Sequence, residues 1–81
     1  MNVRFDEHAL QFLQKLPFDI RRRIISKIER TISDPFHFWE RLSERTDYKL
    51  RIGDYRAIAE IHAQAIHVTK IGHRKNIYAD G

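Results

Sequence analysis

The residues best suited to chemistry are cations, one histidine and one tyrosine in the C-terminal part of the chain. They are Lys49, Arg51, Arg56, His73, Arg74, Lys75 and Tyr78. Arginine forks match the oxygen geometry of phosphate, whereas tyrosine and histidine stack on a base or transfer a proton. If folding gathers these side chains, they would suit a ligand that carries phosphate groups.

The elements that position these residues begin with a β-hairpin. Two alternating apolar runs flank Gly53-Asp54, and a two-residue loop that begins with glycine suits a type I′ or II′ turn. Counting outward predicts the pairs Ile52–Tyr55, Arg51–Arg56, Leu50–Ala57, Lys49–Ile58 and Tyr48–Ala59. One face then carries Tyr48, Leu50, Ile52, Ala57, Ala59 and Ile61, and the other carries Lys49, Arg51, Arg56 and Ile58.

The pair Arg51–Arg56 places like charges opposite each other, which destabilises a sheet unless an anion sits between them. Splayed arginines on a solvated face, screened by salt, are the alternative. A third strand, predicted at Ile66–Ile71, leads into Gly72-His73-Arg74-Lys75. Because strand ends from one sheet converge, these further cations favour the anion site.

The stretches YKLRIGDYRAIAEI and VTKIGHRKNIY resemble the RelE/ParE superfamily of type II toxin–antitoxin systems. The resemblance covers nearly the whole chain. It implies a compact RelE-like toxin domain over residues 1–81. The residue patterns predict the same α+β architecture: an N-terminal strand, a two-helix hairpin, then a three-strand antiparallel meander.

The resemblance implies one of two activities. RelE-like members are ribosome-dependent endoribonucleases that cut mRNA in the A site by metal-free attack of a ribose 2′-OH. The match implies catalytic roles for Lys49, Arg56, Arg74 and Tyr78, and RNA binding by Arg51, His73 and Lys75. ParE-like members instead poison DNA gyrase without nuclease activity. RelE carries a second lysine where this chain has Asp47, and its Arg-to-Tyr spacing is longer, so the general acid and base stay open.

Partners and surroundings follow from the same resemblance and from composition. The resemblance implies a cognate antitoxin, mRNA on the ribosome with rRNA contacts, and DNA contact only through the antitoxin. Net charge is +4, and residues 45–81 hold seven Lys/Arg against four Asp/Glu, which suits a polyanionic or acidic partner. The chain has no cysteine and no long apolar run, so we expect a cytoplasmic protein without a membrane segment. Its five histidines lack ligand spacing, so we expect neither metal nor other cofactor.

The N-terminal part predicts a strand at Asn2–Phe5 and two helices. Asp6 is a suitable N-cap for a helix over about Glu7–Leu16, which Pro17 interrupts. The second helix, over about Phe18–Ser33, repeats isoleucine every four residues and carries cations on the opposite side. Its apolar stripe consists of Ile20, Ile24, Ile25, Ile28 and Ile32, and its basic side includes Arg21, Arg22, Arg23, Lys27 and Arg30.

The segment from Phe36 to Glu44 is the hardest part of the sequence to interpret. Phe36, Phe38 and Trp39 suit a core that closes one end of the sheet, since aromatic residues in small domains are mostly buried. A partner-binding surface is the alternative.

Overall fold

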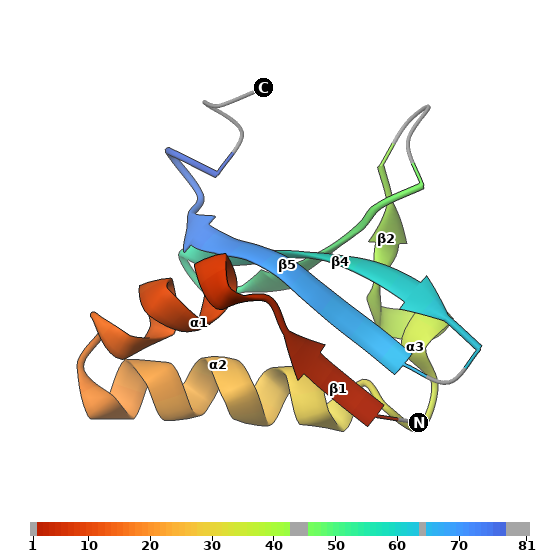
Figure 1. The fold of residues 1–81 in the computed structure, drawn as a ribbon, viewed down its shortest axis with the longest axis horizontal. Coiled ribbons are helices and arrows are strands. Elements are labelled where there is room, and N and C mark those ends of the chain that lie inside the picture. The colour runs from red at the N-terminus through yellow and green to blue at the C-terminus, as the bar shows by residue number, and fades with distance from the viewer. Residues whose placement is uncertain (1, 43–45, 64, 78–81) are drawn as a thin grey trace.

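One sheet with two helices against one of its faces forms the body of the molecule (Figure 1). The structure, a computed structural model, describes residues 2–42, 46–63 and 65–77. Its helices are α1 (Glu7–Gln14), α2 (Phe18–Arg30) and α3 (Pro35–Phe38). Its strands are β1 (Asn2–Phe5), β2 (Glu40–Arg41), β3 (Tyr48–Ile52), β4 (Tyr55–His62) and β5 (Ala65–His73). The predicted α+β architecture is confirmed.

The two long helices begin where the sequence places them and end earlier. Asp6 caps α1 by accepting the His8 N–H at 3.2 Å, so the predicted cap is confirmed. The expected end at Leu16 is wrong by two residues, because the chain tightens before Pro17. The expected end of α2 at Ser33 is wrong by three residues. There the Thr31 N–H turns back to the Ile28 carbonyl and closes the helix.

The hairpin register is confirmed at all five predicted pairs, from Ile52–Tyr55 to Tyr48–Ala59. Gly53 has φ +60°, a conformation that both primed turn types require at their first central position. Because a slip of one residue would move every side chain to the other face, this turn decides which residues are buried.

The sheet has the order β1-β5-β4-β3-β2. The N-terminal strand β1 lies at an edge and pairs in parallel with β5, a neighbour that the sequence does not indicate. A further short strand, β2, pairs with Tyr48 and Lys49 of β3 at the other edge, and the single helical turn α3 precedes it. Neither was predicted, because elements of two and four residues leave no periodic pattern.

A β-bulge in β5 sets which of its side chains reach the helices. Opposite β4, Ala59 pairs with Val68 but Ile58 pairs with Lys70, so Thr69 is the extra residue. Before the bulge, Ile66 and Val68 are buried; after it, Ile71 is buried instead of Lys70. The bulge therefore shifts the alternation by one residue and moves Lys70 to the face away from the helices.

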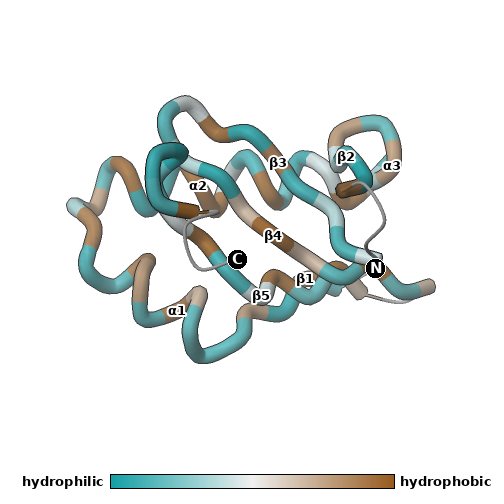
Figure 2. Tube along the Cα trace, turned by 90° about the horizontal axis from the view of Figure 1, so that it is seen from above, coloured by the Kyte–Doolittle hydropathy of each residue, from teal (hydrophilic) through white to brown (hydrophobic). Residues whose placement is uncertain are grey.

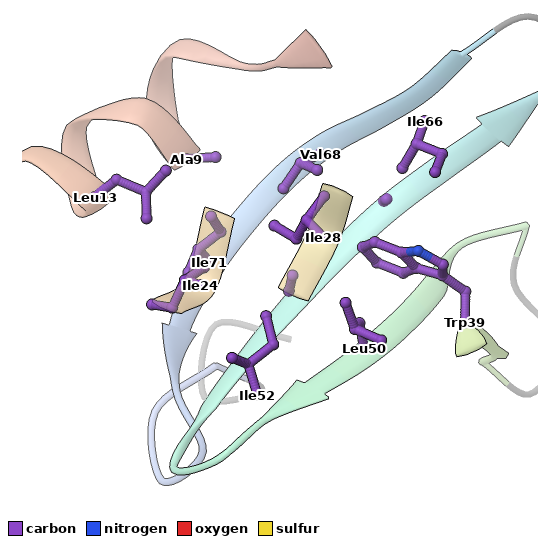
Figure 3. Close-up of a cluster of buried hydrophobic side chains, with 12 residues drawn as sticks. Ala9, Leu13, Ile24, Ile28, Trp39, Leu50, Ile52, Ile66, Val68 and Ile71 are labelled. Atoms are coloured by element: carbon purple, nitrogen blue, oxygen red, sulfur yellow. The ribbon is translucent and has the colours of Figure 1, made fainter. Parts of the chain in front are cut away.

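The core fills the space between the helices and the sheet (Figure 3). From the helices it includes Ala9, Leu13, Ile24 and Ile28, and from the sheet it includes Leu50, Ile52, Ala57, Ala59, Ile66, Val68 and Ile71. The other predicted stripe residues of α2, Ile20, Ile25 and Ile32, pack against it and are partly buried. The apolar stripe of α2 and the core face of the hairpin were therefore predicted correctly.

The interpretation of the aromatic segment as core is right for Trp39 and wrong for Phe36 and Phe38. Trp39 is 3% exposed, and its indole N–H donates to the Thr31 hydroxyl at 2.9 Å. Phe36 is 62% exposed, and its ring contacts the ring of Tyr48. Phe38 is 38% exposed. Phe36, Phe38 and Trp39 lie on or directly after the single turn of α3, so they point in different directions and only Trp39 reaches the core.

We therefore expect Trp39→Ala to lower the free energy of unfolding by about 3 to 5 kcal/mol, since it leaves a large cavity and removes the hydrogen bond that the buried Thr31 hydroxyl accepts. The matched control, Phe36→Ala, should cost less than about 1 kcal/mol because that ring is mostly in solvent. Urea unfolding of both variants measures the difference. Equal losses would contradict the placement of Trp39 alone in the core.

Candidate functional site

The sheet face opposite α1 and α2, here called the open face, carries a cluster of cations. Figure 2 views the sheet from this side, with each residue coloured by its hydropathy. Register places two rows across it: Lys49, Ile58 and Lys70 in one row, and Arg51, Arg56 and Gly72 in the next. Directly opposite residues have Cβ atoms about 4.5 to 5.5 Å apart, and diagonal neighbours are about 7 to 8 Å apart. Four cationic side chains thus leave the sheet around Ile58.

Arg56 is held in place by the turn of its own hairpin. Its Nη1 donates at 2.8 Å to the backbone carbonyls of both Gly53 and Tyr55. These carbonyl dipoles stabilise a guanidinium that faces Arg51 across the strand pair, so the cross-strand repulsion is offset without a bound anion. Nε and Nη2 of Arg56 have no partner among the described residues. Three N–H donors of a fixed fork are therefore free to meet an anion.

Lys49 is partly covered and faces a carboxylate. Its Nζ lies 3.6 Å from Oε2 of Glu40, the residue that pairs with it across β2 and β3. Side-chain exposure is 25% for Lys49 and 70% for Glu40, so the ion pair borders solvent and contributes at most about 1 kcal/mol. The short strand β2 thus orients Lys49 without burying it.

Arg74 is tied to the hairpin turn by Asp54. The Arg74 N–H donates to the Asp54 carbonyl at 2.8 Å, and Nε of Arg74 lies 3.7 Å from Oδ1 of the same residue. The chain after β5 therefore returns next to the turn of the hairpin whose strand β4 carries Arg56. Figure 1 shows this segment leaving the sheet on the side away from the helices.

The same C-terminal turn packs on the open face through Ile77. A Cβ at Gly72 would lie 3.0 Å from Cδ1 of Ile77, so only glycine leaves room for this side chain. Ile77 is 3% exposed, and Ile58, which faces away from the helices, is 6% exposed. This end of the open face therefore has an apolar floor between its cations.

His73, Lys75 and Tyr78 are placed differently from the cluster. His73 pairs with Tyr55 on the helix side of the sheet, and the two rings meet edge to face with centroids 5.6 Å apart. Its Nδ1 accepts the Lys75 N–H at 3.2 Å, and Lys75 is exposed in the following turn. The structure thus does not bring His73 to the open face. Tyr78 lies outside the described residues.

The family model for the ParE toxin of type II toxin-antitoxin systems, parDE, matches residues 3–78. The chain belongs to this toxin family. The superfamily assignment made from the two sequence stretches is therefore confirmed. Among curated proteins, no significant match was found for the toxin.

Solved toxin–antitoxin structures share the toxin's fold. The RelBE2 complex of Mycobacterium tuberculosis aligns with a TM-score of 0.78 and 23% identity, covering 90% of this chain and 96% of that one. The RelB–RelE complex of Methanococcus jannaschii has a TM-score of 0.72, 24% identity and coverages of 95% and 96%. The intact RelBE complex of E. coli has a TM-score of 0.71, 24% identity and coverages of 88% and 93%. At these identities the likeness concerns the fold alone.

Three residues of the site were missed by the sequence analysis. Lys70 joins the open face only because of the bulge. Asp54 orients Arg74 from a turn much earlier in the chain, and Glu40 orients Lys49 from the neighbouring strand β2. The sequence could have indicated the role of Asp54. An acidic residue in a hairpin turn lies near the end of the strand that pairs with the hairpin, and Arg74 directly follows that strand. No helix of the described residues is long and apolar enough to cross a membrane.

The packing of Ile77 on Gly72 can be tested by a double-mutant cycle. Gly72→Ala should lower the free energy of unfolding by about 1 kcal/mol or more, because the new Cβ overlaps Cδ1 of Ile77. Ile77→Val removes Cδ1, so in that background Gly72→Ala should cost at least about 0.5 kcal/mol less. Denaturant unfolding of the four proteins measures the coupling. Additive effects would show that the C-terminal turn does not rest on Gly72.

Proposed function

We propose that this toxin is a metal-independent endoribonuclease that cleaves mRNA in the ribosomal A site, with the open face as its active site. The observation that carries the proposal is the cation set around Ile58, with the Arg56 fork held toward solvent by two carbonyls. Cleavage of a phosphodiester by its own ribose builds negative charge on phosphorus oxygens. Fixed cations placed where charge develops are the protein's main means of accelerating such a step.

The reaction proceeds by attack of the ribose 2′-oxygen on the adjacent phosphorus as the bond to the 5′-oxygen breaks. The products are a 2′,3′-cyclic phosphate and a 5′-hydroxyl, with one proton leaving the 2′-OH and one reaching the departing oxygen. Arg56 and Arg74 would clamp the phosphate, and Lys49 would supply charge or transfer a proton. Arg51 and Lys75 would hold the flanking RNA. Tyr78 would stack on a base or assist the 2′-OH.

His73 takes a different role in this proposal from the one that the sequence suggested. Its ring lies against Tyr55 on the helix side, and its Nδ1 accepts the Lys75 N–H. It would therefore shape the turn that carries Arg74 and Lys75 rather than exchange protons with RNA.

We also propose a cognate antitoxin as the toxin's protein partner. The RelBE structures that share its fold are complexes of a toxin with an antitoxin. A net charge of +4 and a basic open face suit an acidic antitoxin segment that covers the cations. DNA would then be contacted only through the antitoxin, and the toxin would act in the cytoplasm on mRNA, with rRNA contacts at the ribosome.

Gyrase inhibition is the second candidate, because the family model that matches is that of ParE toxins. In this alternative the open face would bind protein, and no RNA would be cut. Two assays separate the candidates. Primer extension on translated messages should show cuts inside codons, whereas supercoiling by purified gyrase should be unchanged by the toxin. Inhibited supercoiling without mRNA cuts would replace the nuclease proposal.

We expect Arg56→Gln to lower the mRNA cleavage rate about 100-fold or more, since one fixed donor set at the developing charge is lost. Arg56→Lys should recover only part of this loss, because lysine keeps the charge without the fork. Tyr78→Phe should also relieve growth inhibition. The matched control, Lys15→Gln, removes an exposed cation next to α1 and should cleave like the wild type.

Circular dichroism of each variant confirms that it is folded. Full toxicity of both Arg56→Gln and Tyr78→Phe would contradict the assignment of the catalytic set.

A further inference from the structure

A second basic surface lies outside the open face, in a groove between α2 and the outer edge of β3. The groove encloses about 500 Å³. We call it the basic groove, after the five cations that line it: Arg22, Arg23, Lys27, Arg30 and Arg51. Asp19 is the one acid among the described residues that line it. The proposed catalytic set uses none of the helix residues, so this surface needs its own explanation.

The helix wall presents its cations at regular intervals. Arg23, Lys27 and Arg30 are separated by four and three residues, so they follow one side of α2 with a rise of about 6 Å and then about 4.5 Å. Like charges at these spacings repel each other along a helix. The stripe therefore carries a cost that a bound polyanion would remove.

The strand wall of the groove is formed by Arg51, Ile52 and Gly53. Among the described residues β2 pairs only with Tyr48 and Lys49, so this part of the β3 edge has no neighbouring strand. A charge on an edge strand commonly protects it from pairing with another chain. Here four of the five cations lie on α2 and not on the edge strand, so protection of the β3 edge does not account for them.

Carboxylates do not neutralise these cations within the described part of the chain. No ion pair within 4.0 Å joins a described acid to any of the five, and Arg22, Arg23, Arg30 and Arg51 are exposed. Lys27 lies 5.6 Å from the centre of the Phe38 ring, a contact that preserves its charge. The groove is therefore a hollow with five cations against one acid.

Arg51 connects this groove to the open face. It lines the groove, and it stands opposite Arg56 in the hairpin register. The cations thus form one track that starts at Arg56, passes Arg51 at the edge of β3 and continues along α2. A single strand of nucleic acid follows such a track by its phosphates, since every nucleotide offers the same charge.

We infer that the basic groove binds the phosphate backbone of single-stranded RNA and continues the strand that reaches the open face. The role of this strand as mRNA rests on the proposed function, whereas the binding itself does not. Four of the five cations are arginines, whose forks suit phosphate, and Ile52 is the one large apolar residue in the described part of the lining. An acidic protein segment would need apolar contacts that this groove does not offer.

The test is the salt dependence of RNA binding by the purified toxin. The probe is a fluorescein-labelled oligouridylate of about 12 nucleotides, followed by anisotropy between about 50 and about 200 mM KCl. The slope of log K against log salt should lose about 1.4 in magnitude in Arg23→Gln/Arg30→Gln, or about 0.7 for each lost phosphate contact. The matched control, Lys15→Glu, lowers the net charge by the same two units outside the groove and should keep the wild-type slope.

Asp19→Asn provides a change of opposite sign. Removing the one acid of the groove should tighten binding, a gain that partial unfolding cannot imitate. Thermal unfolding of all variants shows that they are folded.

Equal slopes for the groove variant and the wild type would overturn the inference, and so would equal losses in the groove variant and Lys15→Glu. Stronger binding of oligoglutamate than of oligouridylate would assign the groove to an acidic protein instead. RNA binding that depends on the groove, without any mRNA cleavage, would end the nuclease proposal and leave this inference intact. Cleavage of mRNA that persists when RNA binding does not depend on the groove would overturn this inference and leave the nuclease proposal intact.

Discussion

The placement of side chains on the open face depends on the packing of α1 and α2 against the other face of the sheet. Strand side chains alternate between faces, so when one apolar side chain points at the helices its neighbours in the strand point to the open face. Lys49 and Arg51 flank buried Leu50, and Arg56 precedes buried Ala57. The apolar core thus does more than stabilise the fold. It forces a set of cations onto the one sheet face that the helices leave uncovered.

Cations placed this close together repel one another. Backbone carbonyls and single acidic residues offset this repulsion, rather than a buried network of ion pairs. Two turn carbonyls hold Arg56, Glu40 faces Lys49, and Asp54 meets Arg74. Each partner orients a side chain and still leaves charge toward solvent. The arrangement suits the anion binding and release proposed for this face, since fully neutralised cations would gain little from a ligand.

The hairpin and its faces could be predicted because they follow from local rules. Gly53-Asp54 selects a tight turn, and alternation then assigns every side chain by counting. The bulge at Thr69 breaks that counting in β5, since alternation from Ile66 and Val68 would bury Lys70. Its position depends on how β5 meets β4, so no pattern within β5 reveals it. His73 was likewise assigned by type, while its face is set by pairing with Tyr55.

By itself, the sequence determined the toxin family, the α+β class, the apolar stripe of α2 and the hairpin register. These rest on turn chemistry and on periodicities of two and about four residues, which are local properties. Only the tertiary structure decided that β1 joins β5, that Lys70 reaches the open face and that Asp54 holds Arg74. It also set α2 against the bare edge of β3 to form the basic groove. Those contacts join residues far apart in the chain, and their geometry follows from packing the whole sheet against the helices.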